Sequence, residues 1–271
     1  MKLEFHPAVA DSGIIFIRTD LPGRPRIAAN IANRITGPRR TTLVSDDVAV
    51  EMVEHVLSAL AGLKIDNCEV HVNQAEMPGL DGSSIGFVLA LESAGKVELE
   101  ETREITWVTE TIRIGTEDSW IEIAPTENQS FELEFFLDYP SHASIGRQRW
   151  ETKLTTVGYC EHIAPARTFV LDTEAEQLRA NGLGARVGYQ DLLVFDQDGP
   201  IDNELRYDDE CARHKVLDMI GDFSLIGTDI VGKFTAYKSG HHLNSEVVLE
   251  LLKQSVAATA ESQPNKRRLS A

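Results

Sequence analysis

A histidine and an aspartate four residues apart are the first candidates for chemistry in this chain of 271 residues. His214 and Asp218 share one face if their segment is helical. The positions around them are apolar: Val216, Leu217, Met219, Ile220 and Phe223. A carboxylate among apolar side chains is costly unless it is paired, and imidazole with carboxylate suits a divalent cation such as zinc. The plain alternative is a surface hydrogen bond between the two side chains.

A second histidine, His55, follows Glu54 in a segment whose apolar residues recur at helical spacing, 47–62. Taken alone, these two side chains could equally be a solvated carboxylate and a half-buried imidazole. The segment resembles the one around His214, because each histidine is followed by a glycine seven residues later and then by a β-rich stretch. Two similar units packed about a pseudo-twofold axis would place both histidines at one cleft.

Such a cleft would unite three metal ligands and one base. His55, His214 and Asp218 would hold zinc with a fourth position open to water, as in catalytic zinc sites. Glu54 would then accept a proton from that water.

Composition excludes several classes of function. The net charge of −17 leaves no basic stripe for nucleic acid and disfavours adhesion to an anionic membrane. Three widely spaced cysteines, Cys68, Cys160 and Cys211, indicate a reduced compartment and no thiolate zinc site. The sequence has no apolar run long enough for a membrane span and no signal peptide at its start. A cytoplasmic protein is therefore expected.

The elements that must position these residues form an α+β pattern. Residues 1–95 predict a first two-layer α/β sandwich unit, residues 96–260 a similar second unit that opens with a polar linker at 96–103, and residues 261–271 a disordered tail. Helices are predicted at 48–61, 85–94, 174–180, 211–222 and 244–258. Strands are predicted at 13–19, 68–73, 105–108, 111–114, 120–123, 131–137, 189–195 and 230–237.

Five segments, in this order, resemble the UDP-3-O-acyl-N-acetylglucosamine deacetylases, a family of zinc amidases in lipid A biosynthesis. The segments are 53–67, 80–83, 166–169, 213–222 and 234–244. Each segment alone is a weak signal, whereas five in the family's order are specific. The resemblance implies hydrolysis of the 2-acetamido group of a UDP-linked, 3-O-acylated amino sugar, with release of acetate.

The resemblance also implies roles for individual residues. The implied zinc ligands are the three residues already singled out, with Glu54 as the general base. His241 would stabilise the transition state and protonate the leaving amine, and Asp222 would keep that imidazole charged and oriented. The residues alone do not decide between His241 and its neighbour His242; the family pattern places the role on the first.

The substrate side of the site is implied in the same way. Thr168 would present its hydroxyl to the developing oxyanion. Lys215 and Lys238 would contact the nucleotide diphosphate, and Tyr139 would offer an aromatic face near the uracil. For the two lysines the alternative is solvated surface charge. The implied enzyme acts as a monomer, without nucleic acid and without stable membrane insertion.

Two other functions stay open, and three departures from the family bear on them. The chain could be a non-catalytic UDP-sugar-binding paralogue or a zinc amidase for another acetamido sugar. Residues 1–8 resemble the family's second strand, so either the start site is misassigned or this is a trimmed variant. Val170 and Leu171 replace a glycine and an aromatic residue in the acyl passage, and 184–191 replaces a more regular Gly-rich stretch.

Overall fold

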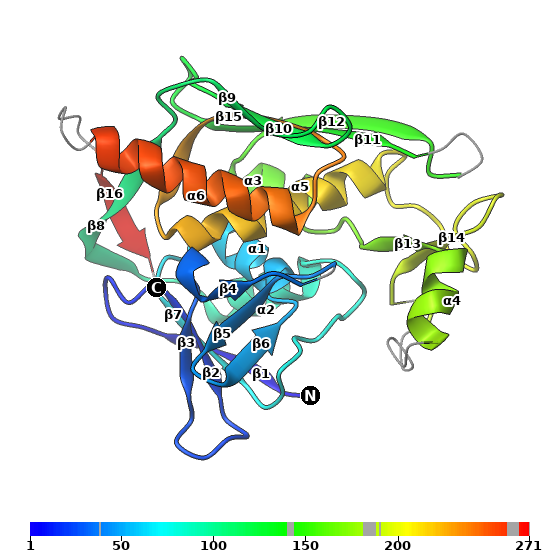
Figure 1. Ribbon diagram of the computed structural model, residues 1–271. Coiled ribbons are helices and arrows are strands. Elements are labelled where there is room, and N and C mark those ends of the chain that lie inside the picture. The colour runs from blue at the N-terminus through cyan, green and yellow to red at the C-terminus, as the bar shows by residue number, and fades with distance from the viewer. Residues whose placement is uncertain (38, 140–143, 181–187, 190, 259–265, 271) are drawn as a thin grey trace.

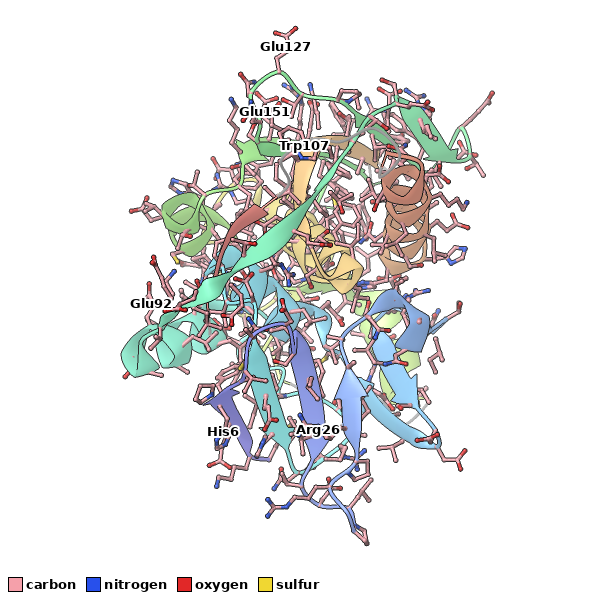
Figure 2. All side chains as sticks on the ribbon, turned by 90° about the vertical axis from the view of Figure 1, so that its left-hand side faces the viewer. His6, Arg26, Glu92, Trp107, Glu127 and Glu151 are labelled. Carbon is pink, nitrogen blue, oxygen red and sulfur yellow. The ribbon has the colours of Figure 1, made fainter. Side chains whose placement is uncertain are left out.

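Helices α1 (Glu54–Gly62) and α5 (Glu210–Phe223) pack against each other between the two larger sheets of an α+β fold (Figures 1 and 2). The computed structural model describes residues 1–37, 39–139, 144–180, 188–189, 191–258 and 266–270. The helices approach closely because Gly221 has no side chain: a Cβ at this position would overlap the carbonyl of Glu54. This contact brings together the two helices that carry the candidate histidines.

The N-terminal half of the described chain supplies a four-stranded sheet in the order β1-β7-β2-β3 and a three-stranded sheet in the order β4-β5-β6. The strands of the first are β1 (Leu3–Pro7), β2 (Ile14–Arg18), β3 (Arg26–Ala28) and β7 (Cys68–Val72). Those of the second are β4 (Arg34–Ile35), β5 (Thr42–Ser45) and β6 (Val48–Glu51), preceded by the 3-10 turn η1 (Ile31–Asn33). Helix α2 (Ile85–Ala94) packs beside α1.

The C-terminal half supplies the second large sheet, whose main path is β12-β11-β15-β10-β9. Its strands are β9 (Ile112–Gly115), β10 (Trp120–Ala124), β11 (Phe131–Asp138), β12 (Arg147–Lys153) and β15 (Asp229–Tyr237). Helices α5 and α6 (His241–Ala258) cover one face (Figure 1). Alternation along β11 turns Leu133, Phe135 and Leu137 into the core.

Shorter elements connect these layers. They are α3 (Thr156–Gly158), the π-helix η2 (Tyr159–Ile163), β13 (Phe169–Leu171), α4 (Asp172–Ala180), β14 (Leu193–Phe195) and the 3-10 turn η3 (Ser224–Ile226). Strands β13 and β14 pair in parallel. No helix in the described part of the chain has the length and apolarity needed to cross a membrane.

The structure differs from the expected elements at the start of the first helix. Residues 48–51 form strand β6, which pairs with β5, and the helix begins only at Glu54. The backbone at Met52 adopts a left-handed φ of 60°, which interrupts helical geometry. The apolar spacing that favoured a helix from residue 48 therefore spans two different elements.

The expected linker and tail also differ from the structure. Much of the expected linker belongs to β8 (Glu98–Trp107), and β16 (Lys266–Ser270), within the expected disordered tail, pairs with it antiparallel. Residues 261–265 and 271 lie outside the described part. Ser270 donates its N–H to Asp66 Oδ2 at 2.8 Å and accepts backbone N–H groups from Asp66 and Asn67. The charged composition of residues 261–271 predicted a disordered tail. The edge of β8 instead offers backbone hydrogen-bond partners to β16.

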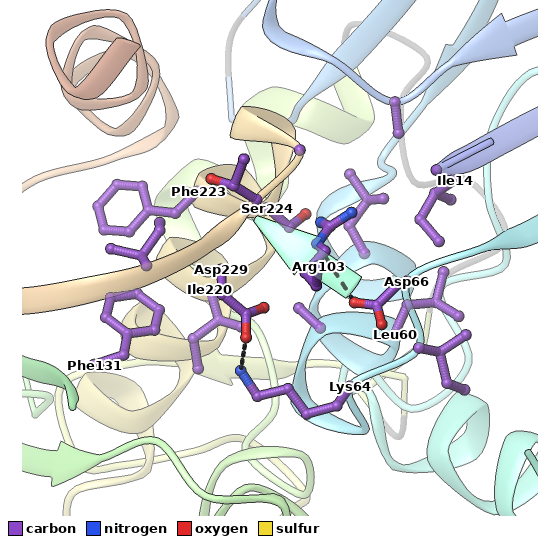
Figure 3. Close-up of a pocket in the computed structure, with 18 of the residues that line it drawn as sticks. Ile14, Leu60, Lys64, Asp66, Arg103, Phe131, Ile220, Phe223, Ser224 and Asp229 are labelled. Atoms are coloured by element: carbon purple, nitrogen blue, oxygen red, sulfur yellow. Dashed lines mark hydrogen bonds and ion pairs between the residues drawn. The ribbon is translucent and has the colours of Figure 1, made fainter. Parts of the chain in front are cut away.

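A pocket opens where the two halves meet, lined by residues of α1, α5, β8 and β15 (Figure 3). Its volume is about 710 Å³ when the open mouth is included. The apolar lining includes Leu57, Leu60, Ile220, Phe223 and Phe131. Two ion pairs among the lining residues join the halves, Lys64 with Asp229 and Arg103 with Asp66, each at 3.5 Å.

Candidate active site

Two histidines and an aspartate meet where α1 crosses α5. The donor atoms of His55, His214 and Asp218 lie within 4.8 Å of one another, and among the described residues no other such group of three histidine, cysteine or acidic side chains does so. Asp218 Oδ1 lies 3.3 Å from His214 Nε2 and 3.7 Å from His55 Nε2. The imidazole rings are nearly perpendicular, at 89°. All three side chains are buried, so the structure brings the predicted ligands together.

The surroundings of the three side chains fit a divalent cation. His214 Nδ1 lies 3.1 Å from the Ala166 carbonyl, which fixes the proton on Nδ1 and leaves the lone pair of Nε2 facing the cluster. Burial lowers the pKa of His214, although Asp218 opposes this, and a lowered pKa favours the neutral ring that a metal ligand must be. His55 presents its Nε2 to the same cluster, 3.7 Å from Asp218 Oδ1.

Asp218 stays ionised in this buried setting. Burial works to raise its pKa, but His214 and Lys215 together hold it well below the ordinary value. Lys215 Nζ donates to Asp218 Oδ2 at 3.0 Å, which leaves Oδ1 toward the imidazoles. Two imidazole nitrogens and one carboxylate oxygen thus form a donor set that suits zinc.

Glu54 stands beside this cluster because it immediately precedes His55 at the start of α1. Its side chain is buried, and Oε2 accepts the backbone N–H of Thr41 at 3.0 Å. Burial raises the pKa of this carboxyl, while His241 and His55 lower it. Oε1 lies 4.0 Å from His241 Nε2. A carboxylate and an imidazole therefore approach each other next to the candidate metal ligands.

His241, the first residue of α6, is held by a buried carboxylate. Its Nδ1 lies 2.8 Å from Asp222 Oδ2, which also accepts the side-chain amide of Asn244 at 2.7 Å. Burial alone would lower the pKa of His241, but Asp222 outweighs it and raises the pKa to about 10. The side chain of His242 is 66% exposed and lies 3.6 Å from Glu246. Of the two neighbouring histidines, His241 is the one that faces the cluster.

The segment before β13 forms another wall of the site and carries Thr168. Ala166 contacts His214, and the Phe169 ring lies 6.4 Å from the His214 ring. Thr168 stands between them in the chain and donates its backbone N–H to the Gly82 carbonyl at 2.7 Å. The structure thus places Thr168 in the wall that touches a candidate ligand, as a partly buried residue.

The three expected substrate-binding residues do not all gather here. Tyr139 and Lys215 both meet Phe169: the Tyr139 ring lies 5.9 Å from the Phe169 ring, and Lys215 Nζ lies 5.4 Å from its centroid. Lys238 is instead exposed in the loop between β15 and α6, with a left-handed φ of 51°. It lies three residues before His241 and outside the cluster. The departure at 184–191 falls mostly outside the described residues.

Thr41, a buried residue at the site, was not predicted from the sequence. Thr41, just before β5, contacts Glu54 with its backbone N–H and Asp222 with its hydroxyl. It lies 13 positions before Glu54 along the chain, so no helical or strand periodicity connects the two. The contact depends on how the small sheet packs near α1, which only the tertiary structure reveals.

A buried His-His-Asp donor group beside a carboxylate and an imidazole-carboxylate pair is the arrangement of a hydrolase that activates water. Comparison with protein families agrees: the model described as "LpxC: UDP-3-O-acyl N-acetylglycosamine deacetylase" matches residues 1–253. The chain belongs to this family and is a hydrolase of the deacetylase class, which acts on a linear amide.

Individual relatives support the same assignment. The UDP-3-O-acyl-N-acetylglucosamine deacetylase of Nautilia profundicola is 36% identical over 259 residues, which cover 94% of this chain and 85% of the relative. The protein of the same name from Psychrobacter cryohalolentis is 38% identical over 255 residues, covering 93% and 79%. That of Saccharophagus degradans is 38% identical over 250 residues, covering 92% and 82%.

Proposed function

We propose that this protein is a zinc-dependent deacetylase that hydrolyses the 2-acetamido group of UDP-3-O-acyl-N-acetylglucosamine and releases acetate in lipid A biosynthesis. The observation that carries the proposal is the convergence of His55, His214 and Asp218 next to the buried carboxylate of Glu54. A protein that only bound a UDP-sugar would have no use for a buried carboxylate beside a metal-ligand set. This geometry therefore disfavours the non-catalytic paralogue.

One zinc ion would be held by the two Nε2 atoms and by Asp218 Oδ1, the atoms that face one another. When bound, it would lower the pKa of a water molecule and polarise the amide carbonyl. Lys215 keeps the second oxygen of Asp218 occupied, so Asp218 presents a single oxygen. The carbonyl of Ala166 holds His214 in the tautomer that a ligand requires.

Glu54 is the proposed general base. It accepts a proton from the attacking water as the new C–O bond forms at the amide carbon. Its Oε2 is tied to the Thr41 N–H at 3.0 Å, which leaves Oε1, the oxygen that lies toward His241, for proton transfer. The burial that raises its pKa makes the carboxylate a stronger base than an exposed glutamate.

His241 is the proposed general acid. Its Nε2 faces the cluster while its Nδ1 is held by Asp222 at 2.8 Å. The raised pKa keeps the ring charged at neutral pH, so it stabilises developing negative charge and donates a proton to the amine nitrogen as the C–N bond breaks. The products are acetate and the free amino sugar.

Residues of the second wall are proposed to bind the substrate. Thr168 would offer its hydroxyl to the oxyanion, since its segment contacts His214 on both sides. Tyr139 and Lys215 meet at Phe169, a combination of aromatic surface and positive charge that suits a nucleotide diphosphate. Lys238 is proposed as a more peripheral contact with the same diphosphate. The protein is further proposed to act as a cytoplasmic monomer.

Acetate release from UDP-3-O-acyl-N-acetylglucosamine tests the proposal, with UDP-N-acetylglucosamine as the matched substrate that lacks the acyl chain. We expect rapid release from the acylated substrate only, and its loss after metal chelation. Faster release from a different acetamido sugar would instead support the alternative amidase. Val170 and Leu171 in β13, which depart from the family pattern, are the reason to test that alternative. Tight binding of the acylated substrate without acetate release would support the binding paralogue.

A further inference from the structure

We propose that Thr41 is a positioning residue for the reaction, because it couples the general base to the carboxylate partner of the general acid. The inference rests on the proposed function, which assigns those roles to Glu54 and Asp222. Thr41 precedes β5 and is fully buried. None of the five segments that resemble the family includes it.

Three contacts place Thr41 between residues from three helices. Its backbone N–H donates to Glu54 Oε2 at 3.0 Å, at the start of α1. Its hydroxyl donates to Asp222 Oδ1 on α5 and lies 3.4 Å from Nδ1 of His241 on α6. A single residue therefore spans the base, the acid and the carboxylate that orients the acid.

The bond pattern around Asp222 shows what the hydroxyl contributes. Asp222 Oδ2 accepts from His241 Nδ1 and from the Asn244 amide, while Oδ1 accepts from Thr41. Hydrogen bonds to both oxygens restrict rotation of the carboxylate and so favour one orientation of the His241 ring. Thr41 also donates its backbone N–H to Glu54 Oε2. The same buried residue therefore helps to set the separation of 4.0 Å between Glu54 Oε1 and His241 Nε2.

Sheet β4-β5-β6, whose strands lie on both sides of Thr41 in the chain, also contacts the backbone of His241. Arg34 in β4 donates from its guanidinium to the His241 carbonyl at 3.2 Å. Strand β4 pairs with β5 in the register Arg34 with Leu43 and Ile35 with Thr42. Sheet β4-β5-β6 and the residue before β5 thus contact both the side-chain partner and the backbone of His241. This sheet and Thr41 position the acid-base pair and supply none of the proposed metal ligands.

Threonine-to-valine and threonine-to-serine substitutions separate the hydroxyl from the packing. Thr41→Val keeps the shape and the N–H to Glu54 but removes the donor to Asp222; Thr41→Ser keeps both donors. A hydrogen bond to a charged group contributes a factor of roughly 10 to 100, so Thr41→Val should lower kcat by about that factor with little change in KM. Thr41→Ser should retain most of kcat. The matched control is Thr42→Val, which removes the next buried hydroxyl.

A second readout does not depend on turnover. The Nδ1 proton of His241, bonded to Asp222, should give a downfield imidazole resonance that His241→Ala abolishes. We expect Thr41→Val to shift or broaden this resonance in zinc-free and zinc-loaded protein, while Thr41→Ser and Thr42→Val leave it in place. This readout remains informative if the wild type releases no acetate, in which case the proposed function fails but the coupling of Thr41 to His241 is still tested.

The outcomes separate positioning from packing. Normal kcat and an unchanged resonance in Thr41→Val, in an enzyme that does release acetate, would overturn the inference alone. Equal losses in Thr41→Ser and Thr41→Val would also overturn it, since they would show a need for packing rather than for the hydroxyl. A fall in zinc content or in melting temperature that both variants share would have the same meaning. Loss in valine with rescue in serine supports it.

Discussion

The two regions that α1 and α5 build together differ in how their charges are compensated. In the pocket of Figure 3, the helices present Leu57, Leu60 and Ile220, and the two ion pairs among the lining residues each place a cation beside an anion at 3.5 Å. In the candidate active site, Asp218 Oδ1 instead faces two imidazole nitrogens. Each ion pair of the pocket joins opposite charges, whereas the active site has three electron-pair donors directed at one another.

This difference indicates which region does chemistry. Buried charged or polar groups are costly unless they are paired or bind a metal, so an arrangement of facing donors persists only if something joins them. The ion pairs of the pocket join the two halves, and each already contains both signs of charge. The same comparison applies to His241 and His242, neighbours that differ because one is held by buried Asp222 and the other is exposed to solvent.

The largest expected effect comes from breaking the donor group itself. In His214→Ala the cluster loses one of its three ligands, so zinc occupancy should fall sharply and turnover with it. Metal analysis of the purified variant, with His242→Ala as a matched histidine control, measures this. Zinc retained at the wild-type level in His214→Ala would show that the metal lies elsewhere.

Removing the base without the ligands should separate metal binding from turnover. Glu54→Gln preserves the size of the side chain, so the zinc content should be unchanged. Turnover should fall by roughly 10²–10⁴-fold, the usual contribution of a general base. The pairing of normal zinc with near-normal acetate release would contradict the role of Glu54.

The pH dependence of turnover should distinguish the roles of His241 and His242. Because His241 donates its proton only when charged, and Asp222 raises its pKa to about 10, turnover should decline as the pH rises toward that value. Asp222→Asn removes the cause of the raised pKa, so the alkaline limb should move to lower pH by about 1–3 units. His242→Ala should leave the profile unchanged. A profile that shifts in His242→Ala alone would reverse the assignment.

The smallest effect is expected at the ion pair between Lys64 and Asp229, which lines the pocket. Lys64→Gln removes one member of a partly exposed pair, and such pairs contribute about 0–1 kcal/mol to stability. The free energy of unfolding in urea should therefore change by no more than that, with turnover and zinc content unaffected. A large loss of turnover in this variant would show that the pocket and the active site are coupled.

Much of this architecture could be predicted from local sequence signals. Helix α2 (Ile85–Ala94) has the predicted bounds, and β10 and β11 each extend only one residue beyond theirs, because their apolar patterns are uninterrupted. The metal-ligand group was predicted from the spacing of His214 and Asp218 and from the resemblance of their segment to the one at His55. The structure confirms that the donor atoms of these three side chains converge. The pseudo-twofold relation of the two units stays a prediction.

What the sequence did not reveal depends on contacts between distant segments. Strand β6 was hidden because Val48 continues the apolar spacing of the following helix, and only the turn at Met52 separates the two elements. Strand β16 was hidden because its partner, β8, lies far away in the sequence. Thr41 was missed for the same reason, since its partners Glu54 and Asp222 come from other elements.

Removal and titration of zinc in the wild-type protein would show whether turnover depends on the proposed metal ion. Protein stripped with a chelator would be titrated with zinc while acetate release from UDP-3-O-acyl-N-acetylglucosamine is followed. We expect no turnover in the stripped protein and full turnover at one zinc per chain. Full turnover in protein shown to contain no metal would contradict the proposed zinc dependence. Recovery of full turnover on zinc addition in variants that lack His55, His214 or Asp218 would contradict the proposed ligands.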